Sequence, residues 1–85
     1  MYKLLYHPRC KKFLKKIPKK DSKRIVEKID EVCENPFSES LNIKKLADTK
    51  NSYRLRVGNI RIVYEVDTLG QKLFVADIDF SGNIY

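Results

Sequence analysis

Three arginines in the second half of the chain are spaced so that they can act together on one ligand. Arg54 and Arg56 alternate with the apolar residues of an expected strand, and Arg61 belongs to the next strand. The Gly58-Asn59 pair between these strands predicts a two-residue hairpin turn. In that register Arg56 lies opposite Arg61. All three guanidinium groups then share one face of the hairpin, because strand side chains alternate between faces.

Two explanations for this concentration of charge remain open. Like charges directly opposite each other destabilise a sheet. One explanation is therefore that the arginine face is simply solvated, with acidic neighbours that relieve the repulsion. With residues 68–70 as a three-residue loop and Gly70 in the left-handed position, Asp77 is expected opposite Arg61. Alternatively, the face binds phosphate groups, which guanidinium groups hold through paired hydrogen bonds. We favour phosphate binding because a short hairpin holds the charges together.

The first half of the chain is expected to supply two helices that support the sheet. Residues 2–6 predict a strand, and Pro8 suits the first turn of the helix that follows. Pro18 is expected to open a second helix, and Asn35-Pro36 to end it, because a residue before proline disfavours helical geometry. The apolar stripes of the two helices are Cys10, Phe13, Leu14 and Ile17, then Ile25, Val26, Ile29, Val32 and Cys33.

From residue 53 onward the apolar pattern has a period of two, which predicts strands. They cover 53–57, 60–67 and about 72–80, with Phe74, Ala76 and Ile78 on one face of the last; residues 37–51 form a polar connector. The fold class is therefore α+β: an N-terminal strand, an antiparallel helix hairpin, and a three-stranded antiparallel meander that completes a four-stranded sheet. With 85 residues, 1–85 form a single domain.

Composition narrows the class of partner. The net charge of +7 favours a polyanion such as nucleic acid or the ribosome. No stretch approaches the roughly 20 apolar residues of a membrane span, and the N-terminus lacks the apolar segment of a secretory signal. A cytoplasmic protein is therefore expected. Cys10 and Cys33 lie on the helix stripes, and the chain has one histidine, so we expect buried free thiols, no metal site and no cofactor.

Three segments of the chain resemble the RelE toxins, particularly the short archaeal type. They are the block YRLRVGNIRIVY at 53–64, the upstream Lys44-Lys45-Leu46, and the helix stop ENPF at 34–37. The expected order of elements matches as well, so the resemblance covers nearly the whole chain. The block at 53–64 is typical of the RelE/ParE superfamily, but it does not separate members that cut RNA from members that act on DNA gyrase.

This resemblance implies a toxin of a type II toxin–antitoxin system that is also an endoribonuclease. Such an enzyme cuts messenger RNA in the ribosomal A site by metal-independent attack of a ribose 2′-OH. The family's catalytic positions fall on Arg54, Arg56, Arg61 and Tyr85. Arg56 and Arg61 are assigned to the phosphate, Arg54 to organising the 2′-OH, and Tyr85 to stacking on a base.

The resemblance also implies partners. They are the ribosome with its messenger RNA, and a RelB-like antitoxin held in a heterodimer or heterotetramer. Lys44 and Lys45 are expected to contact ribosomal RNA, and Lys11 and Lys15 belong to a lysine-rich helix face that can do the same. No membrane partner is expected.

Ser81 departs from the family pattern, which usually has an arginine about four residues before the terminal tyrosine. A missing cation there weakens the case for cleavage and keeps two alternatives open. One is a ParE-like protein that poisons gyrase by binding, without RNA cleavage. The other is a non-catalytic basic module that acts in autoregulation of its operon. His7, the single histidine, is expected to be structural rather than catalytic.

Overall fold

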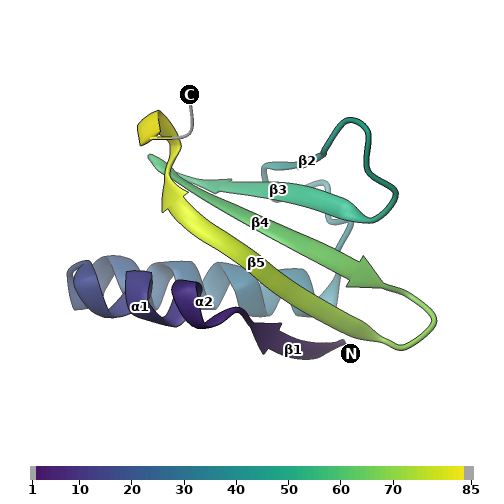
Figure 1. Ribbon diagram of the computed structural model, residues 1–85, viewed down its shortest axis with the longest axis horizontal. Coiled ribbons are helices and arrows are strands. Elements are labelled where there is room, and N and C mark those ends of the chain that lie inside the picture. Colours follow the sequence, from purple (N-terminus) through teal and green to yellow (C-terminus); the bar gives the residue numbers. More distant parts are fainter. Residues whose placement is uncertain (1, 84–85) are drawn as a thin grey trace.

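A computed structural model of the chain describes residues 2–83 and shows a two-layer α+β fold, with two helices on one face of a mixed sheet (Figure 1). The helices are α1 (Pro8–Lys16) and α2 (Lys19–Glu34). The strands are β1 (Lys3–Tyr6), β2 (Ile43–Lys45), β3 (Ser52–Val57), β4 (Ile60–Asp67) and β5 (Lys72–Phe80), followed by a 3-10 turn, η1 (Ser81–Asn83). The strand order is β1-β5-β4-β3-β2, and only the β1–β5 pair is parallel.

The predicted fold class is confirmed, with one strand more than expected. β2 arises inside the polar connector and pairs antiparallel with β3, with Ile43 opposite Leu55 and Lys45 opposite Tyr53. A three-residue segment with two lysines carries too little alternation to be recognised in the sequence, because its strand geometry depends on the partner strand. The sheet therefore has five strands rather than four.

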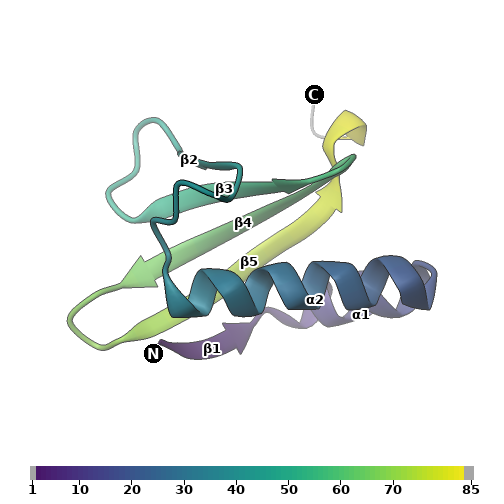
Figure 2. The same ribbon diagram turned by 180° about the vertical axis from the view of Figure 1, so that it is seen from behind.

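The helix boundaries follow the expected signals. Pro8 occupies the first turn of α1, and His7 caps that helix, with its Nδ1 accepting a hydrogen bond of 3.1 Å from the backbone N–H of Arg9. Pro18 precedes α2, which ends at Glu34 where Asn35 turns extended. The helices lie side by side under the sheet (Figure 2). No helix within residues 2–83 is long and apolar enough to cross a membrane.

A single core lies between the helices and the sheet. Its helical members are Cys10, Ile25, Ile29, Val32 and Cys33, and its sheet members are Leu55, Val57, Ile60, Ile62, Tyr64, Val66, Leu73, Val75 and Ile78. The two cysteines are buried free thiols, as predicted. Burial raises the pKa of Cys10 to about 11 and also raises the pKa of Cys33, so neither thiol is ionised at neutral pH.

The β4–β5 connection differs from the prediction. Asp67 pairs with Lys72, so the loop has four residues, and its left-handed residue is Gln71 (φ 53°) rather than Gly70. The register then shifts again between Val63 and Tyr64, as at a β-bulge. Gln71 gives no left-handed signal in a sequence, which is why the loop was predicted one residue too short.

The extra loop residue and the bulge change which residues of β5 enter the core and which lie opposite each residue of β4. Leu73 and Val75 enter the core, so the prediction that Phe74, Ala76 and Ile78 share a face was wrong; of the three only Ile78 is buried. The partner of Arg61 is Asp79, not Asp77, because one extra loop residue and one bulge residue move the register by two. A shift of two keeps an aspartate on the arginine face.

Candidate functional site

The three arginines line one concavity at a corner of the sheet. Arg54, Arg56 and Arg61 surround a cavity of about 220 Å³, which Ser81 and Gly82 close on the side of the C-terminal turn. Figures 1 and 2 both show the tip of the β3–β4 hairpin beside η1 at this corner. Segments about twenty residues apart in sequence thus meet around one pocket.

The hairpin register explains why these side chains converge. Arg56 lies opposite Arg61 and Val57 opposite Ile60, as predicted from the turn. Gly58 has a φ of 60° while Asn59 has no positive φ, which fits a type II′ turn with glycine at its first central position. Burial of Val57 and Ile60 fixes which face enters the core, so the arginines must occupy the other face.

The three guanidinium groups sit in different surroundings. Arg56 is exposed, and its Nε donates a 3.2 Å hydrogen bond to the carbonyl oxygen of Gly58. Arg54 and Arg61 are half-buried. Arg61 faces Asp79 across the β4–β5 pair, whereas Arg54 and Arg56 make no ion pair with any residue between 2 and 83. The pocket therefore keeps a net positive charge, suited to an anion that accepts several hydrogen bonds.

Lys44 and Lys45, which were both expected to contact ribosomal RNA, lie on opposite faces of the sheet. Lys44 pairs with Arg54 across the β2–β3 ladder and so joins the arginine face. Lys45 pairs with Tyr53 and lies on the other face, where it lines a groove with Phe37 and Ile43. Lys44 can therefore extend the positive surface around the pocket, whereas Lys45 cannot reach it from its side of the sheet.

The lysines of α1 lie apart from the arginine pocket. Lys11 and Lys15 are exposed on the helix. Their neighbours Lys12 and Lys16 instead line a groove with Asp77 and Asp79 of β5. Which of these four lysines lie beside β5 could not be predicted from the sequence, because it depends on how α1 is rotated against the edge of that strand.

Ser81 is part of the pocket wall. Its backbone N–H and its Oγ both donate to the carbonyl oxygen of Asn59, at 2.9 and 3.3 Å. The C-terminal turn is thereby tied to the hairpin turn. The position at which the family pattern has an arginine thus lies beside the three arginines, but here it carries a neutral hydroxyl. Tyr85, the fourth predicted catalytic residue, lies outside the described residues.

His7 has a structural role. Besides accepting from the Arg9 backbone, its Nδ1 accepts from Nε of the Arg9 side chain at 3.1 Å. Its ring also packs edge-on against Phe74, with centroids 6.3 Å apart. These contacts occupy the imidazole at the start of α1, as expected for a lone histidine beside Pro8.

Comparisons with known proteins agree with this geometry. A family model described as "ParE toxin of type II toxin-antitoxin system, parDE" matches residues 4–80. A curated Methanocaldococcus jannaschii protein that carries the name RelE1 is 36% identical over 61 residues, which cover 71% of this chain and 68% of the relative.

Solved structures share the fold over almost the whole chain. A chain of the archaeal RelE–RelB complex from Pyrococcus horikoshii matches with a TM-score of 0.84 and 26% identity, covering 95% of this chain and 96% of its own. A chain of the RelB–RelE antitoxin–toxin complex from Methanococcus jannaschii matches with a TM-score of 0.75 and 36% identity, covering 95% and 94%. The isolated Escherichia coli RelE toxin, at 24% identity, a TM-score of 0.80 and coverage of 95% and 85%, matches in fold.

Proposed function

Because the chain belongs to the RelE/ParE family of type II toxin–antitoxin toxins, we propose that it is a ribosome-dependent endoribonuclease that cuts messenger RNA in the A site. The observation that carries this proposal is the pocket in which Arg54, Arg56 and Arg61 converge beside the C-terminal turn. A cluster of guanidinium groups at a concave corner suits a crowded phosphate better than it suits a flat protein contact.

The proposed reaction is attack of a ribose 2′-OH on the adjacent phosphorus. The 2′-OH gives up its proton to solvent as the new O2′–P bond forms a cyclic phosphate, the P–O5′ bond breaks, and the leaving 5′ oxygen takes up a proton from solvent. Negative charge grows on the non-bridging oxygens during this step. Arg56 and Arg61, which lie opposite each other, would bind those oxygens, and Arg54 would orient the 2′-OH and the scissile phosphate.

The remaining predicted residues complete the proposed substrate surface. Tyr85 would stack on an unpaired base and so fix the nucleotide against the arginines. Lys44, on the arginine face, would contact RNA backbone beyond the pocket, while Lys45, Lys11 and Lys15 would act from other surfaces as longer-range attractive charges.

We propose a RelB-like antitoxin as the protein partner, in a heterodimer or heterotetramer. Two of the matched structures are RelE–RelB complexes that contain a chain of this fold. The net charge of +7 favours an acidic partner, and an extended segment that folds on binding can cover such a basic surface.

The proposal is tested by primer extension on messenger RNA in translating ribosomes. The protein should produce stops within the A-site codon, and the same RNA without ribosomes should stay intact. A 2′-deoxy nucleotide at the cleaved position should prevent the cut, because it removes the nucleophile. If the protein remains inactive, and Ser81→Arg restores no cleavage, the endoribonuclease proposal is wrong.

Gyrase poisoning is the second candidate, and two observations favour it. The matching family model is described as a ParE toxin, and Ser81 puts a neutral side chain in the pocket wall. A supercoiling assay with purified gyrase separates the candidates. Inhibition of supercoiling together with intact messenger RNA on ribosomes would assign the protein to gyrase instead.

A further inference from the structure

A second basic groove lies on the helix side of the β3–β4 hairpin. It has a volume of about 320 Å³. Two of its cations, Arg24 and Lys28, come from α2, and the third is Arg56 of the arginine pocket. The rest of the wall is Ser40, Leu41, Asn42, Leu55, Val57 and Gly58.

Arg56 lines both depressions because it lies just beyond the point where β2, the outer strand beside β3, ends. The β2–β3 ladder ends at the pair formed by Ile43 and Leu55. Beyond it, the Arg56 backbone N–H still donates to the carbonyl oxygen of Asn42 at 3.0 Å, but β2 no longer pairs with residues 56 and 57, whose strand partners lie only in β4. The exposed Arg56 side chain lines both depressions, so the two share this arginine at the hairpin.

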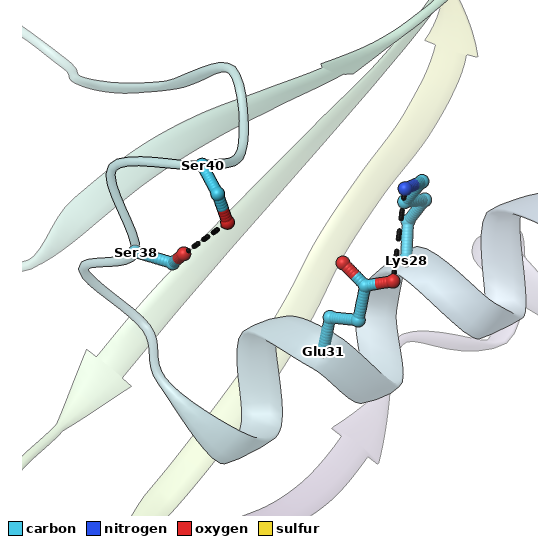
Figure 3. Close-up of polar contacts among 4 residues, drawn as sticks. All are labelled: Lys28, Glu31, Ser38 and Ser40. Atoms are coloured by element: carbon cyan, nitrogen blue, oxygen red, sulfur yellow. Dashed lines mark hydrogen bonds and ion pairs between the residues drawn. The ribbon is translucent and has the colours of Figure 1, made fainter.

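Arg24 lies close to the hairpin turn at Gly58, which has no side chain. A Cβ at Gly58 would come within 3.2 Å of the Arg24 Nη2 atom. Arg24 makes no ion pair within residues 2–83. The Nζ atom of Lys28 lies 3.6 Å from Oε1 of Glu31 (Figure 3). The two side chains are 40% and 52% exposed, and such exposed pairs contribute little to stability.

We propose that this groove is a second phosphate-binding subsite for the same RNA strand, so that the backbone passes from the arginine pocket over the hairpin to Arg24 and Lys28. The inference rests on the proposed RNA function and adds a path for the strand outside the reacting phosphate. Positively charged grooves track a single-stranded backbone. This wall offers three cations, the small polar side chains of Ser40 and Asn42 and three aliphatic side chains, but no aromatic ring for stacking.

The test is binding of single-stranded RNA, measured by fluorescence anisotropy across a series of salt concentrations. Arg24→Ala combined with Lys28→Ala should weaken binding of a long oligonucleotide roughly tenfold. It should also lower the slope of log affinity against log salt by about 1.4, or 0.7 for each lost phosphate contact. A short oligonucleotide that fills only the arginine pocket should bind both proteins equally.

The matched control is Lys3→Ala combined with Lys72→Ala. It removes the same charge at the far end of the sheet, where these residues pair across β1 and β5, and it should leave the salt slope unchanged. All substituted side chains are at the surface, and circular dichroism verifies the fold. Equal effects from the two double variants, or an unchanged slope for the first, would overturn the second subsite.

Three further outcomes separate this inference from the proposed function. If the protein cuts messenger RNA while the Arg24/Lys28 variant keeps its full RNA affinity, the subsite is wrong and the cleavage proposal stands. If that variant keeps its RNA affinity but loses binding of an acidic peptide, the groove serves a protein partner and the inference fails. If the parent protein cuts no messenger RNA while the Arg24/Lys28 variant still shows the lower affinity and the lower salt slope, the groove binds RNA and the cleavage proposal is wrong.

Discussion

At the scale of single residues, the proposed phosphate site needs the planar geometry of the guanidinium group as well as its charge. Arg61 is half-buried and faces Asp79 across the β4–β5 pair. It lines the pocket from β4, the middle strand of the sheet. Lysine at this position would keep the charge but present one compact ammonium group instead of a planar fork. A site built for paired hydrogen bonds to phosphate should detect that difference.

We therefore predict that Arg61→Lys lowers the rate of messenger RNA cleavage by roughly tenfold or more, a smaller loss than the ~10²–10³ expected when a stabilising donor is removed outright. The measurement is the initial rate of A-site cutting on isolated ribosome complexes. Lys72→Arg, at the far end of β5, serves as the control and should cut at the parental rate. Full activity of Arg61→Lys would show that charge alone suffices.

The buried thiol of Cys10 makes stability depend on pH in the alkaline range. Burial is the main cause that raises the pKa of this thiol from 9.0 to about 11, and the carboxylate of Asp77 adds to it. A raised pKa means that the folded protein favours the protonated thiol. The contribution is therefore complete below pH 9.0 and is lost as the pH rises toward 11.

Comparison with Cys10→Ala isolates this effect from the other buried groups. The difference in free energy of unfolding between the parent and Cys10→Ala should be constant at neutral pH and should shrink between pH 9.0 and 11. Urea denaturation at each pH measures it. A difference that grows as the pH rises would contradict the assigned cause.

At the scale of elements, caps and strand register place the side chains that the site uses. The His7 cap begins α1, which packs along β5 through the edge-on contact of Phe13 with Phe80, at 5.3 Å between centroids. β5 carries Asp79 to Arg61 and continues into the turn that holds Ser81. The start of α1 is thus connected to the pocket through one strand.

We predict that His7→Ala destabilises the protein by about 1 kcal/mol, the usual contribution of a side-chain cap at a helix N-terminus. His7→Asn should retain most of that stability, because its side-chain oxygen can accept from the same backbone N–H. Thermal denaturation of the purified variants checks both. Cleavage at the parental rate by His7→Asn is also expected; a large loss of cleavage in a stable His7→Asn protein would indicate a chemical role for the imidazole.

The elements also show how far the sequence could predict this site. The Gly58-Asn59 pair specified the β3–β4 register, and that register alone placed Arg54, Arg56 and Arg61 on one face, as the structure confirms. The β4–β5 register was mispredicted because Gln71 adopts a left-handed conformation and a bulge follows, and neither has a local signal. Lys44 and Lys45 could not be separated until the pairing of β2 was known.

In the molecule as a whole, one face of the sheet packs on the helices and the opposite face carries the arginine pocket. The helices cover one face of the sheet and form the core together with it, so the other face is free to carry charge. Arg24 could not be recognised in the sequence, because its contact with the hairpin turn depends on how α2 packs beneath β3. An alternating charge pattern on a helix usually indicates only a solvated surface, and tertiary packing gives this arginine its position.

The central claim is that the arginine pocket cuts messenger RNA on the ribosome, and primer extension with matched variants tests it most directly. A-site stops are expected with the parental protein and with Lys3→Ala combined with Lys72→Ala. The cleavage rate should fall roughly 10²-fold or more with Arg61→Ala. Equal cleavage by Arg61→Ala and the control, at equal stability, would show that the arginine pocket does not cut the RNA.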